Sequence, residues 1–220
     1  MTKADDAYVL LAEMIEVGRL SPGDFHTESG LVEELGIGRT PLREAVQRLD
    51  RDRLVRIRPG RGIEIPTNSV EDQLRRLEVR RAVEPLAVAL ACERATPGEL
   101  AAVGVLADEL VEINGLEAYV AAVRDTHRLL CEAAHNEYLS DTMTPLQGLS
   151  RKFWLAHVLD PEAEVGAGKE LHLALLRHMV ARDAEAAATA SIRLNDYLVE
   201  FALGVATRKA RVGRRAAAAY

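Results

Sequence analysis

Residues 27–65 read TESGLVEELGIGRTPLREAVQRLDRDRLVRIRPGRGIEI, and this stretch decides the fold of the first part of the chain. Thr27 is a suitable N-cap for a short helix over about 28–35, which Gly36 ends. A second helix is predicted over about 40–51. The apolar face of this pair is formed by Ile37, Leu42, Val46 and Leu49. Two short helices joined by a glycine turn form a helix-turn-helix.

The residues after this helix pair predict a small β-hairpin. Apolar and charged residues alternate over about 55–65, and Pro59-Gly60-Arg61-Gly62 lies at the centre of the run as a turn. A further helix is expected upstream, over about 4–17. The sequence therefore predicts a winged helix-turn-helix as a first domain, residues 1–67.

Beyond a linker at about 66–69, the pattern is helical and no strand signal follows. We expect a second, all-helical domain over residues 68–210 and a basic tail over 211–220. The fold class is mainly α: an N-terminal winged helix-turn-helix with a small β-hairpin wing, followed by an all-α bundle of six to seven helices. The helices of this bundle are expected at about 70–94, 97–113, 116–134, 138–159, 168–182 and 184–207.

Composition excludes several classes of protein. No stretch approaches the roughly 18 apolar residues that span a bilayer, so no membrane partner is expected. The first six residues are short and acidic, unlike a signal peptide. Cys92 and Cys131 are isolated and fit no metal spacing. We expect two reduced core thiols in a cytoplasmic protein.

The net charge of −6 is unevenly distributed along the chain. Residues 39–61 contain eight arginines and three acidic residues, a net charge of +5. Residues 68–207 contain 13 basic and 22 acidic residues, a net charge of −9. A basic segment on an otherwise acidic chain is the expected footprint of a phosphate-binding surface, although a solvated charged face would have the same composition.

A helix-turn-helix reads DNA by placing the first turn of its second helix against base edges in the major groove. Here that turn carries Arg39, Thr40 and Arg43. An arginine can donate two hydrogen bonds to guanine, and a threonine can bond a phosphate or touch a thymine methyl group. Arg48 lies farther along the helix and is expected to meet phosphate, or only water.

The predicted hairpin tip offers a second contact with DNA. Gly60 and Gly62 let the backbone approach the sugar-phosphate chain, and the Arg61 side chain can enter a minor groove. The first domain therefore predicts a sequence-specific DNA-binding regulator whose recognition helix starts at Arg39.

Several motifs within residues 7–66 resemble the GntR family of bacterial transcriptional regulators. They are Leu20-Ser-Pro-Gly-Asp24, Glu28, Glu34-Leu-Gly-Ile37, Arg39-Thr-Pro-Leu-Arg-Glu-Ala-Val46, Leu49, Leu54-Val55 and Gly60-Arg-Gly62. The resemblance implies a homodimer that reads a short, palindromic double-stranded operator. It also implies contact roles for Arg39, Thr40, Arg43 and Gly60.

The chain departs from the family pattern at two positions. Gly38 stands where the family usually has Ser or Thr, so a side-chain cap and its phosphate contact are absent. Ser29 stands where a basic residue is often found. We therefore expect an operator that differs from the usual one at the corresponding bases.

The second domain resembles the FCD branch of the same family over about residues 71–205. The matching segments are Leu77–Pro85, His127–Leu130, Ala133–Asn136, Glu170–His172 and Arg182–Ala187. FCD domains commonly bind a divalent metal through an Asp, a His four residues later and two further His, and the metal holds a carboxylate effector. His127 and His172 match two of these ligands. The Asp position is Val123, and the last His position falls at Leu194 or Asn195.

Two imidazoles alone make a poor site for a divalent cation. We therefore expect His127 and His172 to be metal-free, hydrogen-bonded pocket or core residues, and a rebuilt metal site through these two residues is the alternative. A third possibility is that His127, His172, Asn195 and Arg80 bind an organic acid directly. Arg80 could clamp a carboxylate with two hydrogen bonds, or pair internally with Glu84 four residues later.

The predicted function is a DNA-binding transcriptional regulator, a repressor, that responds to a small metabolite such as a carboxylate. One alternative is a regulator with a degenerate effector site that acts without ligand. A remote alternative is a metal-dependent hydrolase using His127 and His172. The sequence has no carboxylate at ligand spacing from either His, no glycine-rich phosphate loop and no nucleophile motif. We therefore do not expect an enzyme.

Overall fold

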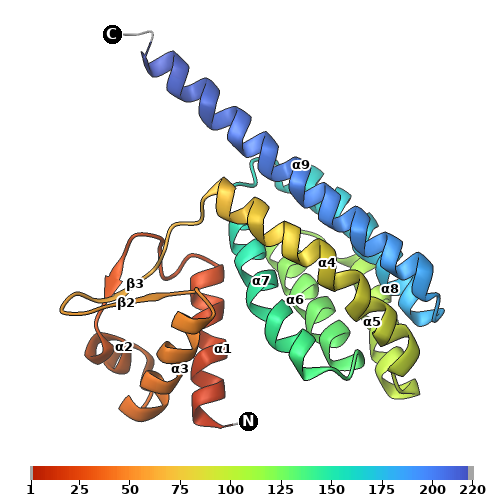
Figure 1. Cartoon of the computed structure of the whole chain (residues 1–220), viewed down its shortest axis with the longest axis horizontal. Helices are drawn as coiled ribbons and strands as arrows, with labels where there is room; N and C mark the ends of the chain where they lie inside the picture. The colour runs from red at the N-terminus through yellow and green to blue at the C-terminus, as the bar shows by residue number, and fades with distance from the viewer. Residues whose placement is uncertain (1, 218–220) are drawn as a thin grey trace. The chain divides into compact units, whose positions relative to one another are not determined.

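The structure is a computed structural model that describes the backbone of residues 2–217 and the side-chain surroundings of residues 2–211. The chain divides into two units, residues 1–69 with 148–156 and residues 70–147 with 157–220. In chain order (Figure 1) the elements are α1 (Lys3–Glu16), β1 (Phe25–His26), α2 (Glu28–Leu35), α3 (Arg39–Arg51), β2 (Arg56–Arg58), β3 (Gly62–Glu64), α4 (Val70–Arg94), α5 (Pro97–Glu112), α6 (Leu116–Ala133), α7 (Glu137–Leu155), α8 (Pro161–Val180) and α9 (Ala184–Ala217). The predicted fold class, mainly α with a small β wing, is confirmed.

The first unit is a helix-turn-helix built on one apolar core. Thr27 caps α2 through its hydroxyl oxygen, which accepts a hydrogen bond from the Gly30 backbone N–H at 3.0 Å. Gly36 ends α2 with a φ of 64°, a left-handed conformation that glycine adopts without strain. Gly38 is the N-cap of α3 and supplies no side-chain hydrogen bond, as predicted. The buried side chains of α3 are Leu42, Ala45, Val46 and Leu49, which pack in a core with α1 and the wing.

The wing is a three-stranded antiparallel sheet with the strand order β1-β3-β2. The predicted hairpin is confirmed as β2 and β3, but the prediction missed β1, which pairs with the other side of β3. A strand of two residues shows no alternation of apolar and polar residues, so its pattern carries no signal. Ile57 is exposed although Ile63 is buried, because β2 is the outer strand of the wing.

The last part of α7 belongs to the first unit. Leu149 lies in the same apolar core cluster as the helices of this unit. The Arg151 guanidinium donates to both carboxylate oxygens of Glu16, at 3.0 and 2.9 Å, and both side chains are largely buried. A buried carboxylate needs such a partner, because removal from water costs several kcal/mol.

The second unit is an all-helical bundle in which α4 packs against α9, α9 against α8 and α8 against α5. Two predicted helix bounds were wrong. The helix expected from residue 168 begins at Pro161, because the Asp160 side chain caps it and proline fits the first helical position. The helix expected to end at residue 207 continues to Ala217, through arginine and alanine residues of high helix propensity, so most of the expected basic tail is helical.

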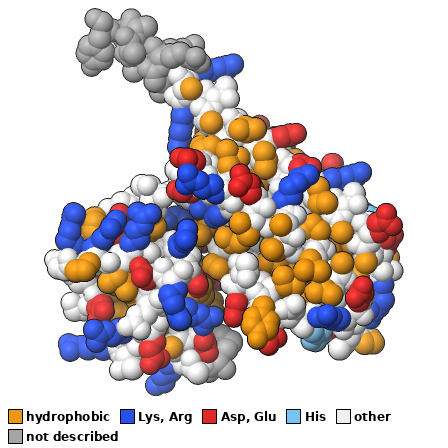
Figure 2. All heavy atoms as spheres, viewed as in Figure 1, with side chains coloured by type: hydrophobic (Ala, Val, Ile, Leu, Met, Phe, Trp, Pro, Cys, Tyr) orange, Lys and Arg blue, Asp and Glu red, His pale blue; other side chains and the backbone are white. Residues whose placement is uncertain are grey.

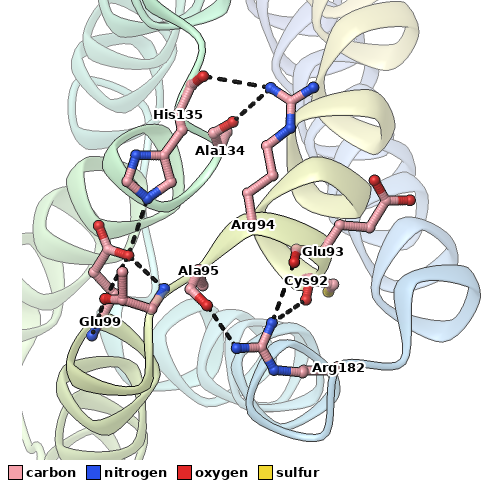
Figure 3. Close-up of polar contacts among 9 residues, drawn as sticks. Cys92, Glu93, Arg94, Ala95, Glu99, Ala134, His135 and Arg182 are labelled. Carbon is pink, nitrogen blue, oxygen red and sulfur yellow. Dashed lines mark hydrogen bonds and ion pairs between the residues drawn. The ribbon is translucent and has the colours of Figure 1, made fainter.

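Arginine side chains close two helix ends of this bundle (Figure 3). The last carbonyl groups of a helix lack backbone partners and need other donors. Arg182 donates to the carbonyl oxygens of Cys92 at 2.7 Å and Ala95 at 2.5 Å, at the end of α4. Arg94 donates to the Ala134 carbonyl at 3.2 Å, just after α6. Within the described residues, no helix is long and apolar enough to cross a membrane.

Helices α6 and α8 approach each other closely at Gly168. A methyl group in place of the Gly168 hydrogen would lie 2.7 Å from ring atom Cζ of Tyr119, far inside van der Waals contact. Tyr119 is buried, so its ring has little room to move aside. Gly168 is therefore required by packing, not by backbone conformation.

We expect Gly168→Ala to lower the free energy of unfolding by about 1–3 kcal/mol, the usual cost of overpacking a core. Gly166→Ala, in the same helix, is the matched control, because a methyl group there meets no atom within 4 Å. That variant should gain about 0.5–1 kcal/mol from helix propensity. Urea unfolding of the full chain measures the free energy of unfolding of both variants. Equal stabilisation by the two substitutions would contradict the close approach of Gly168 to Tyr119.

Candidate functional site

The first turn of α3 presents polar side chains to solvent. Arg39, Thr40 and Arg43 are all exposed, and Figure 2 shows Lys and Arg side chains gathered over the first unit. The Arg43 side chain is 69% exposed, and its Nε lies 3.8 Å from a Glu28 carboxylate oxygen of α2. A surface pair at this distance is weak, so it orients Arg43 without neutralising it. The predicted base-contacting residues thus share one exposed turn.

Arg48 has a different environment. Its guanidinium lies over the Tyr8 ring of α1, 4.3 Å from the centroid, and its Nη1 lies 3.1 Å from the Asp5 carboxylate. Hydrogen bonds from the backbone and hydroxyl of Thr2, and then the Arg48 charge, hold the pKa of Asp5 below its usual range. The positive charge expected to meet phosphate therefore already has a carboxylate partner.

Tyr8 also holds α3 at the end of the helix. Its hydroxyl donates to the Asp52 carboxylate at 2.6 Å. Burial, followed by this hydrogen bond and the nearby Asp52 charge, raises the pKa of Tyr8 well above its usual range. Tyr8 and Arg48 together fasten α3 to α1.

The wing is held to the recognition helix by its backbone. The Ile57 N–H donates to the Asp50 carboxylate at 2.9 Å, so β2 is attached directly to α3. At the tip, the Arg61 N–H donates to the Arg58 carbonyl at 3.0 Å, and Gly60 has a φ of 74°. Proline at the second position and a positive-φ glycine at the third are typical of a type II turn.

Two of the four predicted pocket residues lie together in the second unit. The rings of His127 on α6 and His172 on α8 have centroids 6.2 Å apart. His172 Nδ1 lies 2.8 Å from the Gly168 carbonyl oxygen and 3.1 Å from the Tyr119 hydroxyl. Because a carbonyl oxygen only accepts, Nδ1 carries the hydrogen of this contact.

The other two predicted pocket residues make separate contacts. Arg80 is buried and donates to the Glu84 carboxylate through Nε at 3.1 Å and Nη2 at 2.9 Å. Asn195 donates from Nδ2 to the Leu77 carbonyl at 3.0 Å. Its Oδ1 is buried with no hydrogen-bond partner, and the residue is only 1% exposed. The structure thus shows the Arg80–Glu84 pair that the sequence offered as one alternative.

The family is decided by two adjacent matches that span most of the chain. Residues 3–65 match bacterial regulatory proteins of the gntR family, and residues 75–196 match the FCD domain. The chain belongs to the GntR family. It is a DNA-binding transcriptional regulator of the FCD branch.

The similar proteins agree with this assignment. Over 215 residues, this GntR regulator is 26% identical to the galactonate operon transcriptional repressor of Escherichia coli, covering 88% of this chain and 94% of that protein. It is 29% identical to the uncharacterised regulator YdhC of Bacillus subtilis over 149 residues, 64% of this chain and 65% of that protein. The structure of E. coli McbR/YncC has a TM-score of 0.77 at 21% identity, covering 93% of this chain and 98% of that one, which shows the shared fold. Because these relatives are transcriptional regulators, the hydrolase alternative is set aside.

The residues of this GntR regulator do not fit the metal site that the FCD resemblance implies. Val123 is buried at the position of the expected aspartate, and Asp125 is exposed and paired with Arg128 at 3.1 Å. Across the part of the chain that the structure describes, no group of three or more His, Cys, Asp or Glu side chains could hold a metal ion. His127 and His172 alone lack the three protein ligands that zinc sites usually have.

The sequence missed three aromatic residues that hold functional side chains of this GntR regulator. Tyr8 holds Arg48, Tyr119 contacts His172, and Phe25 lies against Arg61 of the wing. Only Tyr119 had a possible signal, because it stands eight residues before His127 on one helical face. The other two contacts join elements that are separate in sequence, so no spacing rule could reveal them.

We expect Arg48→Ala to lower the free energy of unfolding by about 0.5–1 kcal/mol, the range of an exposed cation–π contact. Because Asp5 already neutralises Arg48, the salt dependence of DNA binding should change little. Arg43→Ala is the control, with little loss of stability. Urea unfolding and binding at several salt concentrations distinguish the two variants. A fall of the salt slope by about 1 in Arg48→Ala would show that Arg48 meets phosphate after all.

We expect the purified regulator to contain well below one divalent metal ion per chain. A bound metal would stabilise the folded state, and its removal would lower the melting temperature. Since we expect no bound metal, dialysis against EDTA should leave the melting temperature unchanged. Elemental analysis and thermal unfolding before and after dialysis measure this. A stoichiometric metal that is lost in His172→Ala would contradict the expectation.

Proposed function

We propose that this regulator is a cytoplasmic repressor that binds a palindromic operator as a homodimer and is released by a small organic acid. The observation that carries the DNA-binding part is the exposed first turn of α3, fixed relative to the wing by the bond between Asp50 and Ile57. The repressor assignment draws on the galactonate operon repressor of Escherichia coli, a relative whose match covers most of both chains.

Arg39, Thr40 and Arg43 would read the major groove. All three are exposed on one turn, and Gly38 ahead of them leaves the backbone N–H groups of this turn uncapped by any side chain. Uncapped N–H groups at a helix N-terminus favour a phosphate oxygen. The tip of the wing, Gly60-Arg61-Gly62, would lie on the adjacent minor groove.

A homodimer is supported by an exposed apolar face on α4. Val79 and Leu86 are 44% and 52% exposed and stand seven residues apart, which places them on one side of the helix. A two-fold axis would bring this face against the same face of a second copy. Two copies would then present two recognition helices to the two halves of a palindrome.

The effector would bind inside the helical unit by direct contacts. His127 and His172 lie together, and the buried Oδ1 of Asn195 lacks a donor. A buried acceptor without a partner costs free energy, which a ligand hydroxyl could recover. A hydroxy acid offers such a hydroxyl and a carboxylate that could accept a hydrogen bond from an imidazole N–H. The acid would release DNA only to the extent that it binds the DNA-bound and free arrangements with different affinity.

A regulator that acts without ligand is the second candidate. The observation that favours it is the commitment of Arg80 to Glu84, which leaves no carboxylate clamp at this position. The orphaned Asn195 Oδ1 and the paired histidines favour the effector-binding form.

Selection of bound duplexes from randomised DNA by the full chain tests the DNA-binding part. We expect a palindrome, protected in two half-sites by two copies of the chain. Arg43→Ala should weaken binding to this duplex by about 1–3 kcal/mol and relax the preference at one base in each half-site. Glu28→Gln, which leaves Arg43 in place, is the matched control. Selection without any enriched sequence would overturn the proposal.

Thermal unfolding with a panel of sugar acids, their neutral parent sugars and simple carboxylates tests the effector part. A hydroxy acid should raise the melting temperature and release the selected duplex, and its neutral parent should do neither. His172→Phe should abolish both effects. If no acid changes either the melting temperature or DNA binding, the ligand-independent candidate stands instead.

A further inference from the structure

The arginine of the wing tip lies over an aromatic ring. The Arg61 guanidinium carbon is 4.5 Å from the centroid of Phe25, a residue of β1 that no part of the proposed DNA surface includes. Phe25 is 42% exposed, although a phenylalanine ring is normally buried when packing permits. The exposed Phe25 ring therefore packs against the Arg61 guanidinium and not in the apolar core.

The backbone of the wing places the start of β3 directly against the end of β1. Gly62 has a φ of 100°, and a methyl group there would lie 2.5 Å from the His26 carbonyl oxygen. The start of β3 thus lies so close to β1 that only glycine, which has no side chain, fits at position 62. Because the two strands run antiparallel, Phe25 lies opposite Glu64, at the far end of β3 from Arg61, and the long Arg61 side chain brings its guanidinium to the ring.

The charge of Arg61 is not neutralised by the contact. Among the residues that the structure describes, Arg61 forms no ion pair, and the nearby Glu64 carboxylate is taken by Arg58 at 2.5 Å. Arg48 differs from Arg61 in this respect. Its guanidinium also lies over an aromatic ring, that of Tyr8, but it is paired with the Asp5 carboxylate. Of these two stacked arginines, only the one on the wing keeps its charge for a ligand.

We propose that Phe25 is a positioning residue that holds the Arg61 guanidinium in an orientation ready for the minor groove. This inference rests on the proposed contact between the wing and DNA. A free arginine side chain loses rotamer freedom when it binds. A ring that already orders the side chain removes part of that cost before DNA arrives. The guanidinium edge stays available to base and sugar oxygens while its face stays on the ring.

A series of substitutions at position 25 separates the aromatic face from apolar bulk. The probe is the duplex that the wild-type chain selects from randomised DNA. Phe25→Leu should weaken binding about two- to fivefold, which corresponds to an exposed cation–π contact. Phe25→Tyr and Phe25→Trp should bind as tightly as wild type or more tightly, because both keep an aromatic face. A ranking by apolar size alone, with Leu close to Phe, would overturn the proposal.

A double-mutant cycle tests whether Phe25 acts through Arg61. Arg61→Ala should weaken binding and lower the salt slope by about 1, whereas Phe25→Leu keeps the charge and should leave the slope unchanged. Adding Phe25→Leu to Arg61→Ala should cause no further loss. An equal loss in both backgrounds would show that Phe25 only supports the strand, and this would overturn the proposal.

The groove itself can be tested with modified bases. Replacing adenine by 2,6-diaminopurine in the A·T pairs beneath the wing adds an amino group to the minor groove and leaves the major-groove edge intact. Wild type and Phe25→Trp should lose affinity on this duplex, and Arg61→Ala should not. If Arg61→Ala binds the unmodified duplex like wild type, the wing contact and this inference both fail. Arg43→Ala still reports separately on the recognition helix.

Discussion

The hydrogen bond between the Asp50 carboxylate and the Ile57 N–H joins α3 to the wing, the two elements that we propose contact DNA. Asp50 stands in the last turn of α3, and Ile57 lies in the outer strand of the wing. A bond from an N–H to a carboxylate is stronger than one between neutral groups. With the apolar core beneath α3, it fixes the direction of the wing relative to the recognition helix. The spacing between the proposed major-groove and minor-groove contacts would therefore depend on this bond and on the apolar core.

The arginines of the first unit fall into two groups, those paired with carboxylates and those left exposed to solvent. Arg48 and Arg58 are paired with Asp5 and Glu64, and they hold elements of the unit together. The arginines of the first turn of α3 and of the wing tip remain exposed. Since like charges repel when close, the pairing of Arg48 and Arg58 with carboxylates also lowers the repulsion among the other arginines of this unit. Arg43 has only the weak contact with Glu28 at 3.8 Å, so its charge remains available for the proposed contact with DNA.

The second unit keeps two of the three histidines that the FCD resemblance implies, but it surrounds them with different chemistry. Val123 removes the carboxylate that would accompany His127, and Tyr119 places a hydroxyl beside His172. A hydroxyl and an imidazole form a hydrogen-bonding surface for an organic ligand more readily than a cation site. The orphaned Asn195 oxygen shows that the interior of this unit is not fully satisfied by its own groups. This interior supports the proposed binding of an effector through hydrogen bonds and not through a metal.

The sequence alone determined the helix-turn-helix, the hairpin, the missing hydroxyl cap at Gly38 and most helix bounds, because caps, breakers and periodicity are local properties of the chain. It also placed Arg39, Thr40 and Arg43 on one turn. Tertiary structure decided which arginines are neutralised, since Asp5 and Arg48 are 43 residues apart. It alone supplied β1, whose two residues pair with Ile63 and Glu64 of β3, nearly 40 residues later in the chain. Contacts of this kind depend on the packing of distant segments, which no local pattern records.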